Sequence, residues 1–161
     1  MRGIVFIALF IVAGASLAGC GQSDQPVQAT AAPAAAIKPE VVIYKSPTCG
    51  CCGKWEEHMR AAGYTVVQKP TEDMAAVKTA QRVPAAVASC HTAVVGGYVI
   101  EGHVPAHAIT RLLSERPAAR GLVVPGMPAG SPGMANPGHE GGYDVLLLRE
   151  DGTTELFEHV S

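Results

Sequence analysis

The chain has 161 residues, of which 48% are hydrophobic and 16% are charged. This hydrophobic fraction can build a core, which excludes a wholly disordered chain, and the length is typical of a single domain. The net charge is −2 and only 5% of the residues are aromatic. Nucleic acid is therefore excluded as a partner, because its binding needs concentrated lysine and arginine and aromatic platforms for the bases. Five cysteines, six histidines and five methionines indicate soft-metal or redox chemistry.

The first twenty residues have the pattern of an export signal. Arg2 precedes an uncharged apolar run over 3–18, which is shorter than the roughly 20 residues that a membrane-spanning helix needs. The run ends in LAGC at 17–20, which resembles the bacterial lipobox, in which the cysteine is acylated and becomes the mature N-terminus. An ordinary signal peptide with an incidental cysteine is the alternative. We therefore predict a lipoprotein signal peptide over residues 1–19.

Acylation of Cys20 would tether the protein to a membrane without spanning it. Gly21 follows the cysteine, where an aspartate would favour retention at the inner membrane, so attachment to the outer membrane is favoured. Together with Cys20, the polar, alanine- and proline-rich stretch up to residue 40 is predicted to form a flexible linker over 20–40. The expected compartment is the periplasm, where disulfides can form.

Residues 41–161 are predicted to form one α/β domain, a sheet with flanking helices. Short β-branched runs alternate with segments of helical spacing. In chain order we expect a strand over 41–45, a helix over 51–62, a strand over 64–68, a helix from about 71 to 82 with Thr71 as its N-cap, strands over 92–95 and 98–101 around a Gly-Gly turn, a helix over 105–116 with Pro105 at its first position, and a C-terminal hairpin of strands over 144–149 and 153–159.

The segment 121–142 between the last helix and the hairpin is rich in glycine and proline, with two methionines. We expect it to lack regular structure. A loop of that length in a compact domain is usually functional or disordered.

Cys49, Cys51 and Cys52 lie between the first strand and the first helix, where the positive end of a helix favours thiolate. Cys49 and Cys52 have the C-x-x-C spacing of a dithiol redox pair, whereas Cys51 makes the motif a C-x-C-C. Such crowding suits poorly a single tetrahedral zinc ion, which typically takes a pair from each of two segments. The crowded cysteines are better suited to Cu(I), because thiolate and thioether ligands bind this ion selectively. A structural disulfide with leftover thiols is the remaining alternative.

Cys90 is the fourth cysteine of the predicted mature chain and lies just before the strand over 92–95. In a thioredoxin-like order of elements, the loop before this strand packs against the N-terminus of the first helix. We therefore expect Cys90 to face the C-x-C-C motif, with His91 adjacent to it.

Four motifs resemble the CopG-like periplasmic copper-resistance proteins, a family long described as metal-binding or of unknown function. They are PTCGCCGKW at 47–55, SCHT at 89–92, EGHVP at 101–105 and GMPAGSPGM at 126–134, and the resemblance extends over about 41–159. It implies a thioredoxin-like domain that holds copper on Cys49, Cys51, Cys52 and Cys90, as a multinuclear cluster that cycles between Cu(I) and Cu(II). Ordinary thioredoxins have a cis-proline before the third strand, whereas Ser89-Cys90-His91 stands there in this chain.

Other soft donors are secondary candidates. Met127 and Met134 lie in the long loop, so we expect thioether ligation by one or both, with packing of the loop over the domain as the alternative. His91 and His103 are candidate imidazole ligands, although His103 could instead serve the start of the third helix. His58 lies too far along the first helix to bind the same ion as the cysteines, so it would need a second ion or a relay role.

The leading hypothesis is a lipid-anchored periplasmic protein of copper resistance, which sequesters copper or changes its redox state. Its expected partners are the membrane and other periplasmic copper-handling or electron-transfer proteins. Turnover as a copper oxidoreductase is left open, because a binding site and a redox site share the same ligands. The alternatives are a thiol–disulfide oxidoreductase that uses Cys49 and Cys52, and a copper chaperone.

Overall fold

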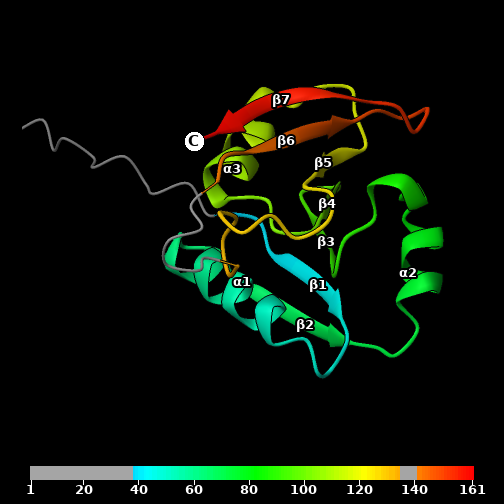
Figure 1. Cartoon of the computed structure of the whole chain (residues 1–161), viewed down its shortest axis with the longest axis vertical. Coiled ribbons are helices and arrows are strands. Elements are labelled where there is room, and N and C mark those ends of the chain that lie inside the picture. The colour runs from blue at the N-terminus through cyan, green and yellow to red at the C-terminus, as the bar shows by residue number, and fades with distance from the viewer. Residues whose placement is uncertain (1–37, 135–140) are drawn as a thin grey trace, which may run out of the picture. The chain divides into compact units, whose positions relative to one another are not determined.

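The computed structural model describes residues 38–134 and 141–161 (Figure 1). The predicted signal peptide, the predicted acylation site at Cys20 and nearly all of the predicted linker lie outside these residues. The elements in chain order are β1 (Val41–Lys45), α1 (Gly50–Ala61), β2 (Val66–Pro70), α2 (Met74–Ala80), the short 3-10 helix η1 (Ala85–Val87), β3 (Thr92–Val95), β4 (Tyr98–Glu101), α3 (Ala106–Glu115), β5 (Gly121–Val123), β6 (Tyr143–Leu148) and β7 (Thr154–Val160). Within the described part of the chain, no helix has the length and apolar character needed to cross a membrane.

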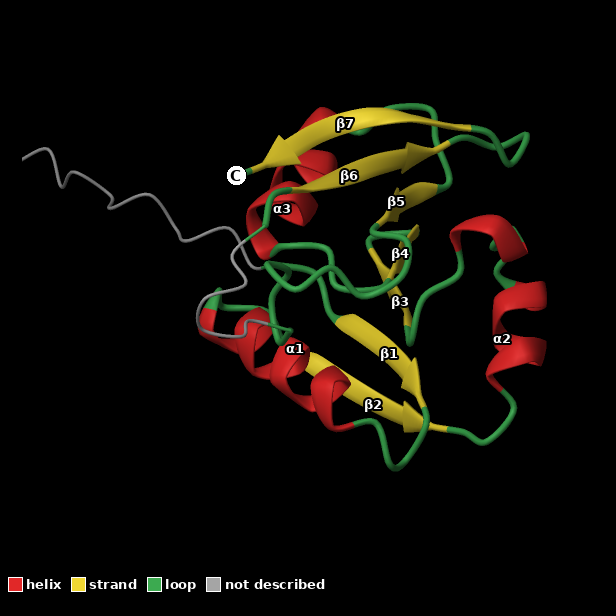
Figure 2. Ribbon diagram, in the orientation of Figure 1, coloured by secondary structure: helices red, strands yellow, loops and turns green. Residues whose placement is uncertain are grey.

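The strands form one seven-stranded sheet in the order β2-β1-β3-β4-β5-β6-β7. β1 pairs in parallel with β2 and β4 with β5, whereas the other neighbours are antiparallel. Figure 2 shows α1 and α2 flanking the β1–β2 part of this sheet from opposite sides. The strands β2-β1-β3-β4 with α1 and α3 have the thioredoxin-like arrangement, which confirms the predicted fold class. β5, β6 and β7 extend the sheet beyond β4.

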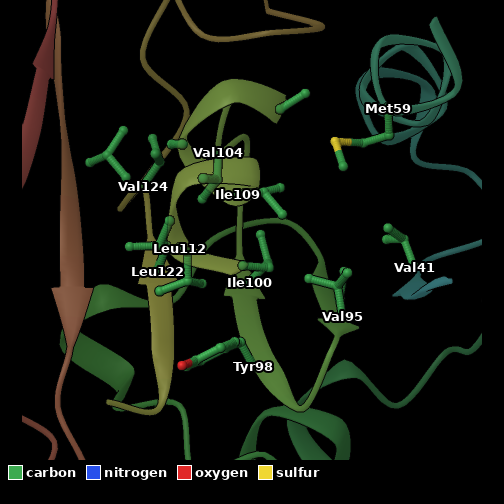
Figure 3. Packing of buried hydrophobic residues seen from close by; sticks show 14 of the residues in the cluster. Val41, Met59, Val95, Tyr98, Ile100, Val104, Ile109, Leu112, Leu122 and Val124 are labelled. Atoms are coloured by element: carbon green, nitrogen blue, oxygen red, sulfur yellow. The ribbon is translucent and has the colours of Figure 1, made fainter. Parts of the chain in front are cut away.

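A single apolar cluster joins α1 and α3 to the sheet (Figure 3). Met59 of α1, Ile109 and Leu112 of α3, and Ile100 and Leu122 of the central strands are all fully buried in it. Burial of each such side chain stabilises the fold by about 1.5–3 kcal/mol. Because both helices share this cluster, the N-terminus of α1 keeps a constant position relative to the ends of β3 and β4.

The predicted loop over 121–142 is wrong at its beginning, because Gly121–Val123 form β5 between β4 and β6. Three residues are too short to show a strand periodicity, and a glycine normally signals a turn. Here Gly121 is needed for close packing, since a Cβ at this position would overlap the carbonyl oxygen of Val99 on β4.

Element ends differ from prediction by a few residues. The N-cap of α2 is Asp73, not Thr71, because the Asp73 carboxylate accepts the amide of Ala76 at 2.9 Å. Pro105 stands one position before α3, as its N-cap, rather than at its first residue. β2 begins at Val66, and the buried Tyr64 instead packs in the core cluster and donates its backbone N–H to the carbonyl oxygen of Met59 at 3.1 Å. The C-terminal hairpin is found one residue from its predicted bounds.

Candidate metal centre

The cysteines meet because the register of the sheet brings two loops together. Tyr44 near the end of β1 lies opposite Thr92 at the start of β3. The turn that follows β1 leads into α1, with Cys49 at the N-cap, while Cys90 precedes Thr92 by two residues. The Sγ atoms of Cys49, Cys51, Cys52 and Cys90 consequently all lie within 4.8 Å of one another.

Two of these sulfurs are joined. Cys49 and Cys52 form a disulfide, with their Cα atoms 5.4 Å apart, whereas Cys51 and Cys90 are free thiols. The Sγ of Cys51 lies 3.5 Å from that of Cys49. Burial, followed by the neighbouring Cys51, raises the pKa of Cys90 to about 11. Cys90 therefore keeps its proton at neutral pH, unless a metal ion replaces that proton.

His103 is oriented to use one particular nitrogen. Its Nδ1 lies 2.6 Å from the carbonyl oxygen of Pro132, which can only accept, so Nδ1 carries the proton. Nε2, with its lone pair, lies 2.9 Å from the Sγ of Cys90. Burial lowers the pKa of His103, which favours the neutral imidazole. Histidines that bind metals commonly donate their other ring N–H to a backbone carbonyl in this way.

His91 lies on the other side of Cys90. It is fully buried, and its Nδ1 is 3.4 Å from the Sγ of Cys90. Its ring centroid is 4.5 Å from Trp55 and 5.0 Å from His103. Nε2 is buried and has no hydrogen-bond partner among the described residues. Nδ1 is the nitrogen that faces Cys90, so a metal ion shared with Cys90 would bind there, and Nε2 would carry the proton.

The loop after β5 contacts the residues around the cysteines and carries both candidate methionines. Ser89 forms a bridge with Gly126, and Pro132 contacts His103. Met127 is 55% exposed at the surface. Met134 is half-buried and ends the described part of the loop, next to a glycine that packs against the first turn of α1. The structure therefore brings His91 and His103 to the cysteines, whereas Met127 lies at the surface.

His58 serves the fold rather than the cysteines. Its Nε2 accepts the backbone N–H of Ala106 at 3.0 Å, which caps the start of α3. Trp55, one turn earlier on α1, donates its ring N–H to the carbonyl oxygen of Val104 at 2.8 Å. These two contacts hold the segment that follows His103 against α1, and no pattern in the sequence pointed to them.

Sequence reasoning also missed Glu101, the last residue of β4. Its fully buried carboxylate accepts the backbone N–H of Ser89 at 2.6 Å and the hydroxyl of Thr92 at 2.7 Å, and pairs with Lys78. These contacts hold the loop that carries Cys90. A charged residue at the end of the apolar strand YVIE, directly before Gly-His, is the signal that could have found it.

The donors fall into two groups that share Cys90. We call Cys49, Cys51, Cys52 and Cys90 the thiolate group, and Cys90, His91 and His103 the imidazole group; the ligand atoms within each group all lie within 4.8 Å of one another. Sulfur and neutral imidazole nitrogen are ligands for soft and borderline ions such as Cu(I) and Zn(II). Magnesium and calcium prefer oxygen, which neither group offers.

Comparisons with other proteins agree with this geometry. The family model described as "Protein of unknown function, DUF411" matches residues 87–134, which include Cys90, His91 and His103. No curated protein matches the chain. Two solved structures, titled "Copper resistance protein copG", Form 2 and Form 1, are each 38% identical to it, with TM-scores of 0.73 and 0.72. They align with 77% and 76% of this chain and with 99% and 98% of their own. With this identity over nearly the whole length of the solved chains, the chain belongs to the CopG family of copper resistance proteins.

Proposed function

We propose that this chain is an extracytoplasmic copper-binding protein of copper resistance, which holds Cu(I) on its thiolate group with His103 as a further ligand. The proposal is carried by one observation, the meeting of four cysteine sulfurs from two segments within 4.8 Å of one another. The titles of the solved relatives name copper resistance, which supports copper as the ion.

The number of donors favours several copper ions over one zinc ion. A structural zinc site is complete with four tetrahedral ligands. Here the Nε2 of His103 lies 2.9 Å from the Sγ of Cys90, so the centre has donors beyond the four sulfurs. Cu(I) ions that share sulfurs would use all of them, as a multinuclear cluster that cycles between Cu(I) and Cu(II).

The pattern of the N-terminus supports a place outside the cytoplasm. The apolar run and the lipobox-like LAGC at 17–20 would direct export and acylation of Cys20. We propose that the protein works in the periplasm, tethered to the outer membrane, and exchanges copper or electrons with other periplasmic proteins.

Copper content tests the proposal. The full chain, reduced and loaded with Cu(I) without oxygen, is expected to carry two or more copper ions by elemental analysis. Cys51→Ser and Cys90→Ser should each lower that number, because each removes a shared sulfur, whereas Cys20→Ser, which removes no member of the thiolate group, should not. An unchanged copper content in both Cys51→Ser and Cys90→Ser would contradict the assignment of ligands.

The Cys49–Cys52 disulfide at the N-terminus of α1 favours a second candidate, a thiol–disulfide oxidoreductase. Against it stands the segment before β3, where Ser89-Cys90-His91 occupies the place of the cis-proline of thioredoxins. The Cys51→Ser variant separates the two functions, since it keeps the dithiol. A dithiol oxidoreductase would still reduce a disulfide substrate at nearly the rate of the unmodified chain, whereas a copper centre would lose copper.

A further inference from the structure

We propose that the Cys49–Cys52 disulfide sets how much copper the centre holds: the thiolate group binds copper only when this disulfide is reduced, whereas the imidazole group binds one Cu(I) ion in both states. This inference rests on the proposed copper binding, and it adds that the redox state of the disulfide controls the number of copper ions bound.

Disulfide formation removes half of the thiolate group. The sulfurs of Cys49 and Cys52 are bonded to each other, so neither can act as a thiolate. Only Cys51 and Cys90 then remain as thiol donors of that group. The full set of four thiolates that would bridge several ions is therefore available only in the reduced chain.

The imidazole group does not depend on the disulfide, because it contains neither Cys49 nor Cys52. Each of its members is held by contacts elsewhere in the fold. The loop of Cys90 is held by Glu101, His103 is held by the carbonyl oxygen of Pro132, and His91 packs between Trp55 and His103. In the disulfide form these donors still lie within 4.8 Å of one another.

The charge of this group selects Cu(I). Both histidines are fully buried, and a buried net charge without a partner is costly. One thiolate, two neutral imidazoles and Cu(I) sum to zero charge. Zn(II) or Cu(II) on the same donors would leave one positive charge in the interior. The imidazole group therefore suits a single monovalent soft ion.

The redox step balances as an exchange with a dithiol. A dithiol reductant attacks the Cys49–Cys52 bond through a mixed disulfide, becomes a disulfide itself, and leaves two protein thiols. Two electrons and two protons pass to the protein. Cu(I) then displaces the thiol protons to solvent as it binds. Running the exchange in reverse expels copper from the thiolate group, and the ion on the imidazole group stays.

The test compares two forms of the full chain. One is reduced and freed of reductant, and the other is oxidised, with the disulfide verified by peptide mapping and by a loss of two free thiols. Each is titrated with Cu(I) without oxygen or added thiol. We expect two or more copper ions in the reduced chain and one in the oxidised chain. An oxidised chain that binds none, or as many as the reduced chain, overturns this inference. A reduced chain that binds none overturns the proposed function itself.

Variants assign the retained ion to the imidazole group. In the oxidised chain, His103→Gln should lower Cu(I) affinity at least about tenfold. His159→Gln is the matched control, because His159 is exposed and paired with Asp144, and it should leave affinity unchanged. Unchanged affinity in His103→Gln overturns the assignment.

A second variant keeps the test decisive if His103→Gln does not fold. The double variant Cys49→Ser/Cys52→Ser should bind one ion before and after oxidant treatment, with no change in its thiol count. Absence of copper from this variant would overturn the inference.

Discussion

The carbonyl oxygen of Pro132 decides which nitrogen of His103 faces Cys90. Because that oxygen accepts a hydrogen bond from Nδ1–H, the lone pair of Nε2 points to the sulfur at 2.9 Å. Glu101 likewise helps to position Cys90, because its carboxylate accepts the backbone N–H of Ser89, the residue before Cys90. Neither Pro132 nor Glu101 offers a donor to the metal ion, yet both determine where the donors lie.

Glu101→Gln should destabilise the chain by about 3 kcal/mol, because it leaves the mostly buried Lys78 without its carboxylate partner. It should also weaken Cu(I) binding, since the loop of Cys90 loses an anchor. The free energy of unfolding, from urea denaturation of the metal-free chain, measures the first effect. Glu115→Gln is the control, as the exposed Glu115–Arg111 pair is worth less than about 1 kcal/mol. Equal losses in both variants would contradict the structural role of Glu101.

At the scale of elements, α3 depends on α1 for its cap. Pro105 has no side-chain acceptor, so the first amide of the helix, that of Ala106, is satisfied by Nε2 of His58 on α1. This contact requires a neutral imidazole. Burial, and then the charge of His107, lower the pKa of His58 from its ordinary value of 6.5.

The cap makes stability depend on pH. Below about pH 6.5 the unfolded chain takes up a proton on His58 that the folded chain does not. The contribution of His58 is therefore complete above this pH and decreases as the pH falls, by up to about 1.4 kcal/mol per pH unit. His58→Gln keeps an acceptor that does not titrate. Urea midpoints of the metal-free chain between pH 5 and 7.5 should fall less steeply in His58→Gln, and identical slopes would contradict the cap.

Elements with strong local signals were predicted well. The hairpin β3–β4 has its expected bounds, because β-branched runs flank a Gly-Gly turn. β5 was missed, since its place between β4 and β6 depends on contacts far along the chain, which Gly121 permits by lacking a side chain. Local sequence patterns predict elements that are stabilised by nearby residues, whereas the formation of a short strand such as β5 depends on the strands beside it.

At the scale of the whole molecule, the loop after β5 contacts both α1, which carries the C-x-C-C motif, and His103 of the imidazole group. Gly133 lies against α1 with φ +85°, and a Cβ there would be 2.9 Å from both the carbonyl oxygen of Cys51 and the amide nitrogen of Trp55. The adjacent Pro132 contacts His103. Displacement of this loop should therefore disturb the imidazole group without touching a ligand.

Gly133→Ala is expected to lower Cu(I) affinity by about tenfold, because it moves the Pro132 carbonyl off His103. Gly126→Ala is the matched control: its φ is also positive, at +69°, but a Cβ there meets nothing within 4 Å. The control should lose only about 1 kcal/mol of folding stability, from backbone strain, and keep its Cu(I) affinity. Copper affinity is measured by competition with a Cu(I) chelator, and equal losses in the two variants would contradict the proposed role of the loop.

The cysteine motif could be recognised because its residues are neighbours in sequence, whereas contacts between residues far apart in the chain could not be predicted. Cys49, Cys51 and Cys52 stand in one motif, and Cys90 followed from the thioredoxin-like order of elements. His103 was only one of several candidates until the structure placed its Nε2 beside Cys90. The role of Glu101 could not be predicted, because a hydrogen bond from β4 to the loop before β3 leaves no periodic pattern.

The sequence alone therefore determined the donor chemistry, the order of the strands and helices other than β5 and η1, and the predicted export pattern of the N-terminus, because each depends on residue type and local spacing. The tertiary structure decided which donors come together. The register of β1 against β3 brings Cys90 to the C-x-C-C motif, and the loop after β5 orients His103 while Met127 stays at the surface. Such contacts join residues far apart in the chain, and their geometry exists only once the shared core has formed.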